Sequence, residues 1–309
     1  MAFDTDAWLE RRKLARRANF WRLIAVLAIL VAVIGGLYWL DPGNVIERRQ
    51  DHVARFEISG IIHENDWWMD KLHEAADDDR VKALILYINS PGGSTYGGEA
   101  LFTAIRKVAE RKPVVAVIGT LGASAGYMTA IAADRIYARE SSLTGSIGVL
   151  FETAEFSALL AKLGVSAESI ASGPLKDQPS PVKPLSPEGR AQIRRLVMET
   201  YDWFVRLVAE RRQMPRERVV ALADGRVYTG RAAVENGLID ALGGVEDARD
   251  WLAEKKGIPA DLPLRDIPPE PPREGWEGLT GRAFAALFGK SLLTERLKLD
   301  GLVSLWHPE

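Results

Sequence analysis

Apolar runs in the middle of the chain predict a repeating order of strands and helices. Residues 53–58 alternate between apolar and polar types, as a half-buried strand does. Residues 81–88 and 113–118 are almost wholly apolar, which is typical of strands buried inside a parallel sheet. Polar-faced helical patterns at 66–77 and 99–110 separate these runs. The alternation predicts an α/β fold with a largely parallel sheet.

The second half of the compact region has shorter apolar runs. We expect a short helix at 156–163, a strand at 166–170 and a proline-rich loop at 173–185. The sequence Ser-Pro-Glu at 186–188 predicts the start of a long helix, because serine caps a helix and proline suits its first turn. A further helix at 245–256 is expected to close this region.

A nearly uninterrupted apolar run near the N-terminus predicts a membrane anchor. Residues 20–40 match the roughly 20 apolar residues that cross a bilayer. Arginine and lysine residues gather before and at the start of the run, whereas Asp41 follows it. The positive-inside rule therefore places the N-terminus in the cytoplasm and the rest of the chain outside. A cleavable signal peptide is the alternative, but residues 37–40 lack the small residues of a cleavage site.

These patterns divide the 309 residues into five parts. The expected parts are a cytoplasmic N-terminus at 1–19, a transmembrane anchor at 20–40, a stalk at 41–52, a compact α/β domain at 53–260, and a proline-rich linker with a C-terminal tail at 261–309. The tail contains an amphipathic helical pattern and ends in an apolar segment at 301–306. We expect this segment to lie in a neighbouring groove or on a membrane surface, with disorder as the alternative.

Composition narrows the chemistry. The formal net charge is −2, so nucleic acid is not expected as a partner. Cysteine is absent, which excludes a thiol nucleophile, a thiolate metal site and a disulfide. The histidines His52, His63, His73 and His307 include no pair spaced like metal ligands, and no nucleotide-binding glycine loop is present. We therefore expect neither a metal nor a cofactor.

A serine between small residues is the first candidate for catalysis. The sequence Gly-Ala-Ser-Ala-Gly at 122–126 follows the apolar run at 113–118 and precedes a helix-like segment. A strand-to-helix turn of this kind presents the hydroxyl of Ser124 as a nucleophile, with a helix N-terminus that favours developing negative charge. The alternative is a turn of small residues at which two backbones pack closely, because the motif also occurs by chance.

A serine nucleophile needs a base and oxyanion donors. No histidine follows Ser124 within the α/β core, so a lysine made neutral by burial is the expected base. Lys176 is favoured because a glycine and a proline fix the loop before it, and an ordinary surface lysine is the alternative. Ser146 is placed to hold the amine by a hydrogen bond, unless it belongs only to a strand-edge turn. The backbone amides of Ala125 and of the Gly92-Gly93 turn are the expected oxyanion donors.

Several segments taken together resemble the signal peptide peptidase A family of serine-lysine membrane proteases. They are Asn89–Gly93, Gly122–Tyr127, Leu143–Val149, Ser172–Asp177, Asp224–Gly230 and Ala233–Asp240. The resemblance covers about residues 53 to 250 in order, and the combination is specific although no single segment is. One departure is the sequence Ala-Gly-Tyr-Met at 125–128, where many relatives have Gly-Gly-Tyr-Tyr, so the shape of the pocket stays open.

The resemblance implies a ClpP/crotonase-like fold, assembled into a ring on the membrane. Ser124 maps to the family's nucleophile, Lys176 to its general base and Ser146 to the residue that hydrogen-bonds this lysine. Gly93 and Ala125 map to the oxyanion donors. Members of this length complete each site with the lysine of a neighbouring protomer, which implies a homo-oligomer, with an octamer expected.

The function that the resemblance implies is hydrolysis of hydrophobic peptides, such as signal-peptide remnants, without ATP or metal. The catalytic domain would face the periplasmic or outer side of a bacterial inner membrane. Two alternatives stay open. A crotonase-type acyl-CoA enzyme shares the oxyanion chemistry without requiring Ser124 or Lys176, and a catalytically silent membrane scaffold would use a ring only to organise partners.

Overall fold

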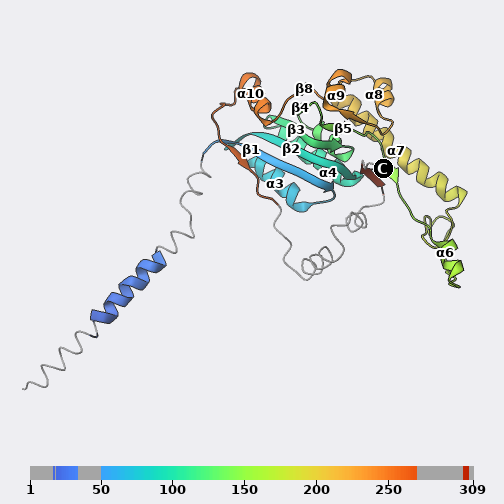
Figure 1. Cartoon of the computed structure of the whole chain (residues 1–309), viewed down its shortest axis with the longest axis horizontal. Coiled ribbons are helices and arrows are strands. Elements are labelled where there is room, and N and C mark those ends of the chain that lie inside the picture. Colours follow the sequence, from blue (N-terminus) through green and yellow to red (C-terminus); the bar gives the residue numbers. More distant parts are fainter. Residues whose placement is uncertain (1–16, 18, 34–49, 270–301, 306–309) are drawn as a thin grey trace, which may run out of the picture. The chain divides into compact units, whose positions relative to one another are not determined.

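The computed structural model describes residues 17, 19–33, 50–269 and 302–305, and the chain divides into two compact units at residues 50 and 51 (Figure 1). In the first unit, residues 19–33 form a helix whose side chains are exposed. Within the described residues, no helix is both long and apolar enough to cross a membrane. The last part of the predicted anchor, residues 34–40, lies outside the described residues, as does the amphipathic pattern at 279–299.

The second unit is built on one mixed sheet in which most strand pairings are parallel. The strands are β1 (His52–Ile62), β2 (Val81–Ser94), β3 (Val114–Ala123), β4 (Arg135–Ala138), β5 (Leu143–Gly145), β6 (Leu150–Phe151), β7 (Val227–Thr229), β8 (Ala241–Leu242), β9 (Leu264–Asp266) and β10 (Leu302–Leu305). The long strands β1, β2 and β3 lie side by side in parallel. Antiparallel pairing is confined to β7 with β5 and to β10 with β2 and β6. The predicted α/β fold with a largely parallel sheet is confirmed.

Helices cover both faces of this sheet (Figure 1). They are α3 (Asp66–Asp77), α4 (Thr95–Ala109), α5 (Ala125–Ala130), α6 (Ser157–Lys162), α7 (Pro187–Arg212), α8 (Arg216–Leu222), α9 (Gly230–Asn236) and α10 (Val245–Lys256). On β2, Leu84, Leu86 and Ile88 face the larger core beneath α3, α4, α5 and α7, whereas Ala83 and Ile85 face α10. A strand buried on both faces needs an almost continuous apolar sequence, which explains the run at 81–88.

The segment between β6 and α7 extends away from the sheet and contains only one short helix among its described residues. We call residues 152–185 the arm, and Figure 1 shows its helix α6 apart from the sheet, beyond the first turns of α7. The strand predicted at 166–170 is wrong, because these residues have no regular structure and Ile170 is 97% exposed. A short β-type sequence forms a strand only when a neighbouring strand accepts its hydrogen bonds, and here none is paired with it.

Candidate active site

Ser124 occupies a strained turn between β3 and α5. Its φ of 56° and ψ of −117° are unfavourable for any residue that carries a Cβ atom. The Ser124 backbone N–H donates to the carbonyl oxygen of Gly145 at 2.8 Å, and its own carbonyl oxygen accepts from the N–H of Met128 at 2.8 Å. The Ser124 side chain does not cap α5, although the residue is at the N-cap position and is 1% exposed. A strained strand-to-helix turn of this kind is the geometry in which a serine nucleophile is presented.

Small residues allow this turn to pack against the end of β2. A Cβ atom on Gly126 would lie 2.9 Å from the carbonyl oxygen of Ser90, and one on Gly98 of α4 would lie 3.1 Å from the Cβ atom of Ala125. Both contacts are tighter than ordinary packing permits. The close-packed turn that the sequence offered as an alternative is therefore present, and its packing helps to hold Ser124 in the strained conformation.

The candidate oxyanion donors lie at the same edge of the sheet. Ala125 is buried and begins α5, so its N–H is among those left without a partner inside the helix. Gly93 lies near the end of β2, which pairs with β3 up to the Ser90–Gly122 position. A Cβ atom on Gly93 would lie 1.8 Å from the carbonyl oxygen of Ile62, so this position accepts only glycine. Ligands of parallel α/β sheets bind beyond the carboxyl ends of the strands, which is where these groups lie.

Ser146 lies beside the Ser124 turn. It follows β5, whose last residue Gly145 pairs with Ala123 at the end of β3 and accepts the hydrogen bond from Ser124. The φ of Ser146 is 49°, and its N–H donates to the carbonyl oxygen of Arg226 at 2.9 Å. The residue is 6% exposed. The fold thus brings Ser146 to the same sheet edge as the candidate nucleophile.

Lys176 is not brought to this edge by any contact among the described residues. It is exposed in a turn of the arm, where its N–H donates to the carbonyl oxygen of Gly173 at 3.1 Å. The neighbouring Asp177 accepts hydrogen bonds from Lys183 and Ser169, which hold the pKa of the Asp177 carboxyl below its usual value. The described contacts therefore bring Ser146, but not Lys176, to the edge of the sheet at which Ser124 lies.

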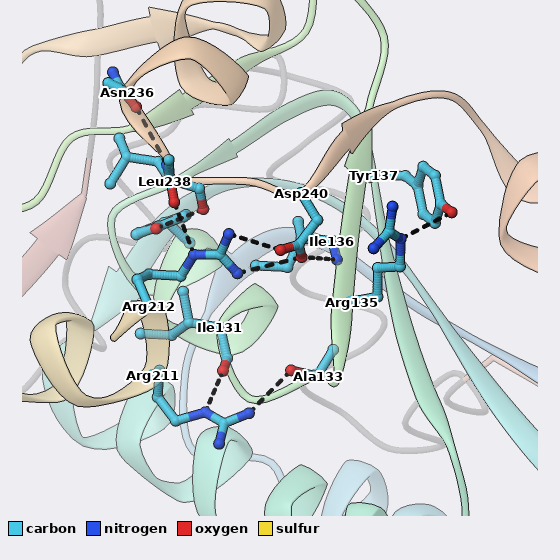
Figure 2. A network of polar contacts seen from close by, with 12 residues as sticks. Ile131, Ala133, Arg135, Ile136, Tyr137, Arg211, Arg212, Asn236, Leu238 and Asp240 are labelled. Atoms are coloured by element: carbon cyan, nitrogen blue, oxygen red, sulfur yellow. Dashed lines mark hydrogen bonds and ion pairs between the residues drawn. The ribbon is translucent and has the colours of Figure 1, made fainter. Parts of the chain in front are cut away.

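Two arginines that the sequence did not single out hold the far end of α5. Figure 2 shows Arg211 of α7 reaching the chain after α5, where its Nε donates to the carbonyl oxygen of Ile131 at 2.8 Å and its Nη2 to that of Ala133 at 3.0 Å. Arg106 of α4 donates to the carbonyl oxygen of Ala132 at 2.8 Å. These three carbonyl groups come just after a short helix, so the two cations lie at the end of the helix where its dipole favours positive charge.

A second group of contacts fixes the chain that follows. Arg212 pairs with Asp240 at 2.8 Å, and the same carboxylate accepts the N–H of Ile136 in β4 at 2.7 Å (Figure 2). The hydroxyl of Tyr127 in α5 donates to the carbonyl oxygen of Leu238 at 2.8 Å, and complete burial raises the pKa of this phenol. No local pattern in the sequence predicts this network, because its contacts join residues that are far apart along the chain.

Comparison with known proteins gives family matches for the region that holds the site. The model of peptidase family S49 matches residues 106–259, and the model of the Clp protease family matches residues 61–143. The chain is 40% identical over 197 residues to a putative signal peptide peptidase SppA of Enterococcus faecium. That match covers 63% of this chain and 57% of the relative.

Other matches differ in how much of the relative they cover. The chain is 37% identical over 210 residues to putative protease slr0021 of Synechocystis, a match that covers 68% of this chain and 76% of the relative. It is 35% identical over 202 residues to the chloroplastic serine protease SPPA of Arabidopsis thaliana, a match that covers 65% of this chain and 30% of that one. A solved structure of a mutant ClpP1 from Listeria monocytogenes superposes with a TM-score of 0.43 at 15% identity, over 62% of this chain and 92% of the other.

Proposed function

Because the chain belongs to peptidase family S49, a family of serine proteases, we propose that its second unit hydrolyses peptide bonds with Ser124 as the nucleophile. The resemblance to signal peptide peptidase A that the sequence predicts is confirmed. The observation that carries the proposal is the buried Ser124 turn, whose strained φ of 56° persists only because the surrounding hydrogen bonds hold it. Strain of this kind is concentrated at active sites.

The proposed reaction combines the groups at the sheet edge with the amine of Lys176. The Oγ atom of Ser124 attacks the scissile carbonyl carbon while its proton passes to the amine of Lys176. The N–H groups of Ala125 and Gly93 hold the negative oxygen of the tetrahedral intermediate. The lysine then gives the proton to the leaving amine as the C–N bond breaks. Water hydrolyses the resulting ester and returns the proton to the serine.

In this proposal the base comes from a second copy of the chain. A lysine acts as a base near neutral pH only when burial disfavours its charged form, and Lys176 is exposed in the single chain. The arm that carries it also exposes large apolar side chains, including Leu163 at 68% and Ile170 at 97%. Apolar exposure of this kind is typical of interfaces. Docking of the arm on a neighbouring subunit would bury both groups, which supports a homo-oligomeric ring, with eight copies expected.

The proposed substrates are hydrophobic peptides such as signal-peptide remnants in a bacterial inner membrane. Support comes from the name of the Enterococcus faecium relative and from the apolar sequence at 20–40. Charge at the two ends of that run favours a catalytic unit on the periplasmic or outer side. Neither ATP nor a metal takes part in the proposed chemistry.

The test is mass spectrometry of detergent-solubilised protein after treatment with a fluorophosphonate probe. We expect Ser124 to be labelled in the wild type and in the Lys162→Ala control on the exposed surface of the arm, but not in Lys176→Ala. Labelling of Lys176→Ala at the wild-type rate would assign the base to another group. Absence of labelling in the intact wild type would favour the scaffold alternative, and stabilisation by acyl-CoA would favour the crotonase-type enzyme.

A mixing experiment tests the sharing of the site between copies. Ser124→Ala and Lys176→Ala are each expected to be inactive alone, because each lacks one half of the dyad. Co-assembled protein is expected to regain peptidase activity, because some interfaces then combine an intact serine with an intact lysine. No recovery in co-assembled rings of verified composition would place both residues of the dyad in one chain.

A further inference from the structure

A carboxylate follows the proposed base directly in the sequence. Asp177 comes next after Lys176, in the turn at residues 174–177 of the arm. Negative charge beside a lysine favours the protonated amine, and a protonated amine cannot take a proton from Ser124. The charge on Asp177 therefore opposes the role proposed for Lys176 unless another group compensates it.

Two residues of the arm hold the Asp177 carboxylate. The Nζ atom of Lys183 and the hydroxyl of Ser169 both donate to its Oδ2 atom. These hydrogen bonds lower the pKa of the Asp177 carboxyl, so the group is ionised and pairs with the Lys183 cation. Among the described residues, no hydrogen bond or ion pair joins Asp177 to Lys176. The negative charge next to the proposed base is therefore matched by a positive charge from Lys183.

The chain that follows Asp177 is fixed as well. The Oε1 atom of Gln178 accepts the N–H of Ser186, the N-cap residue of α7, at 3.1 Å. In the first turn of α7, a Cβ atom on Gly189 would lie 2.7 Å from the same Oε1 atom, so a glycine is needed for this contact. The contacts that place Asp177 are therefore made within one chain and do not require a neighbouring copy.

Other charged side chains on the segments that adjoin this loop are exposed. They are Glu152, Glu155, Lys162, Glu168, Glu188 and Arg190. Solvent screens exposed charges, and the described hydrogen bonds and ion pairs of Asp177 are those with Lys183 and Ser169. Lys183 is therefore the group that determines the charge next to Lys176.

We propose that Lys183 is a positioning residue for Lys176: it binds Asp177 and so prevents this carboxylate from stabilising the protonated amine. The Lys183–Asp177 pair has no net charge, so burial of the arm against a neighbouring copy can disfavour the charged form of Lys176. Loss of Lys183 removes a cation and leaves an anion unpaired, and both changes favour the protonated amine. The effect on the reaction rests on the proposed function of Ser124 and Lys176, whereas the pairing of Lys183 with Asp177 does not.

The test is the pH dependence of fluorophosphonate labelling of Ser124 in the assembled, detergent-solubilised chain. The labelling rate should rise as the base loses its proton and then level off at high pH. Lys183→Met should move this rise up by about one pH unit, which makes labelling about tenfold slower below the midpoint and leaves the high-pH rate unchanged. Damage to the fold would lower the high-pH rate instead.

Three further variants identify the charge as the cause. Lys183→Arg keeps the cation and should give the wild-type profile. Lys162→Met, the matched control, removes a lysine from the exposed surface of the same arm and should also give that profile. The double variant Lys183→Met/Asp177→Asn removes both charges and should return the midpoint to its wild-type value. An unchanged profile in Lys183→Met, an equal loss of rate at every pH, or a shift that persists in the double variant would overturn the proposal.

Zero-length carbodiimide crosslinking tests the pairing without any catalysis. In the full Ser124→Ala chain we expect an amide bond between Lys183 and Asp177, with the pair Lys71–Glu74 of α3 as the positive control. A Lys71–Glu74 crosslink without a Lys183–Asp177 crosslink would overturn the pairing. If the pairing is found but Ser124 of the wild type is not labelled at any pH, the proposed peptidase function fails while the pairing stands. If Ser124 is labelled and Lys183→Met has the wild-type profile, the proposed function stands and this inference fails.

Discussion

Replacement of Ser124 by glycine should make the protein more stable while abolishing its proposed activity. The φ of 56° and ψ of −117° at Ser124 suit glycine, which has no Cβ atom to clash with the neighbouring carbonyl groups. Two backbone hydrogen bonds of 2.8 Å, to Gly145 and from Met128, maintain this conformation in the folded state. Ser124→Ala removes the same hydroxyl but keeps the Cβ atom. The difference between the two variants therefore isolates the backbone strain.

The expected size of this difference follows from two opposing terms. A non-glycine residue in a sparsely populated conformation costs about 1–3 kcal/mol. Glycine loses about 0.5–1 kcal/mol relative to alanine through the greater freedom of its unfolded chain. Ser124→Gly should therefore exceed Ser124→Ala in free energy of unfolding by about 1–2 kcal/mol. For a unit of this size, the difference corresponds to an increase in Tm of about 2–8 °C.

The assay is chemical denaturation of each variant in the same detergent, with the free energy of unfolding compared within pairs. Ser90 provides the matched control, because it is buried within β2 and its φ is not positive. At Ser90 the glycine variant should be the less stable one by about 0.5–1 kcal/mol. Opposite signs at the two serines would attribute the effect to backbone strain at Ser124. A Ser124→Gly variant that is no more stable than Ser124→Ala would refute the strain and, with it, the main structural support for the nucleophile.

Three further changes test the surroundings of the site. Gly93→Ala places a Cβ atom 1.8 Å from the carbonyl oxygen of Ile62, so β1 and β2 must separate. We expect the free energy of unfolding, measured by chemical denaturation, to fall by about 3 kcal/mol, and the fluorophosphonate labelling of Ser124 to be lost. Arg211→Met leaves two carbonyl groups after α5 without their donor, so the free energy of unfolding should fall by about 2 kcal/mol. The variant should also lower kcat by a larger factor than it changes KM, and a change in KM alone would contradict a positioning role. Hydrogen bonds from Arg80 lower the pKa of Asp78 from 3.8 to about 2, so this carboxylate stabilises the fold above pH 3.8 and the stabilisation is lost as pH falls to about 2. Asp78→Asn should therefore reduce the dependence of the free energy of unfolding on pH in that range, and an unchanged dependence would show that the pair contributes nothing.

The sequence predicted the centre of the sheet better than its edges. The apolar runs at 81–88 and 113–118 lie almost wholly within β2 and β3, because a strand that is buried on both faces shows its burial in every residue. The short strand β7 pairs with β5 across a long stretch of sequence, and β10 joins the sheet from the end of the chain. Such pairings depend on partners that meet only in the folded protein, so local patterns do not reveal them.

The candidate site shows the same division between local and long-range information. A glycine-rich strand-to-helix turn depends on a few neighbouring residues, so the sequence predicts the strand and the helix on either side of the candidates Ser124 and Ala125. The hydrogen bonds of Arg106 to Ala132 and of Arg211 to Ile131 join residues 26 and 80 positions apart, and nothing local to Arg211 indicates them. The positive φ at Ser146 likewise arises from its neighbours, since serine has no preference for that conformation.

The exposure of Lys176 leads to a prediction about assembly. The turn that holds the serine is supported by the sheet, α4 and α7, all of which belong to one chain, whereas Lys176 is exposed on the arm. If a second copy buries this lysine, an isolated chain has a complete nucleophile turn but no neutral base. Peptidase activity per chain should then rise with protein concentration until assembly is complete, while the rate of hydrogen exchange around Ser124 stays constant. Activity per chain that is independent of concentration across the dissociation range, measured alongside molecular mass by light scattering, would show that one chain supplies its own base.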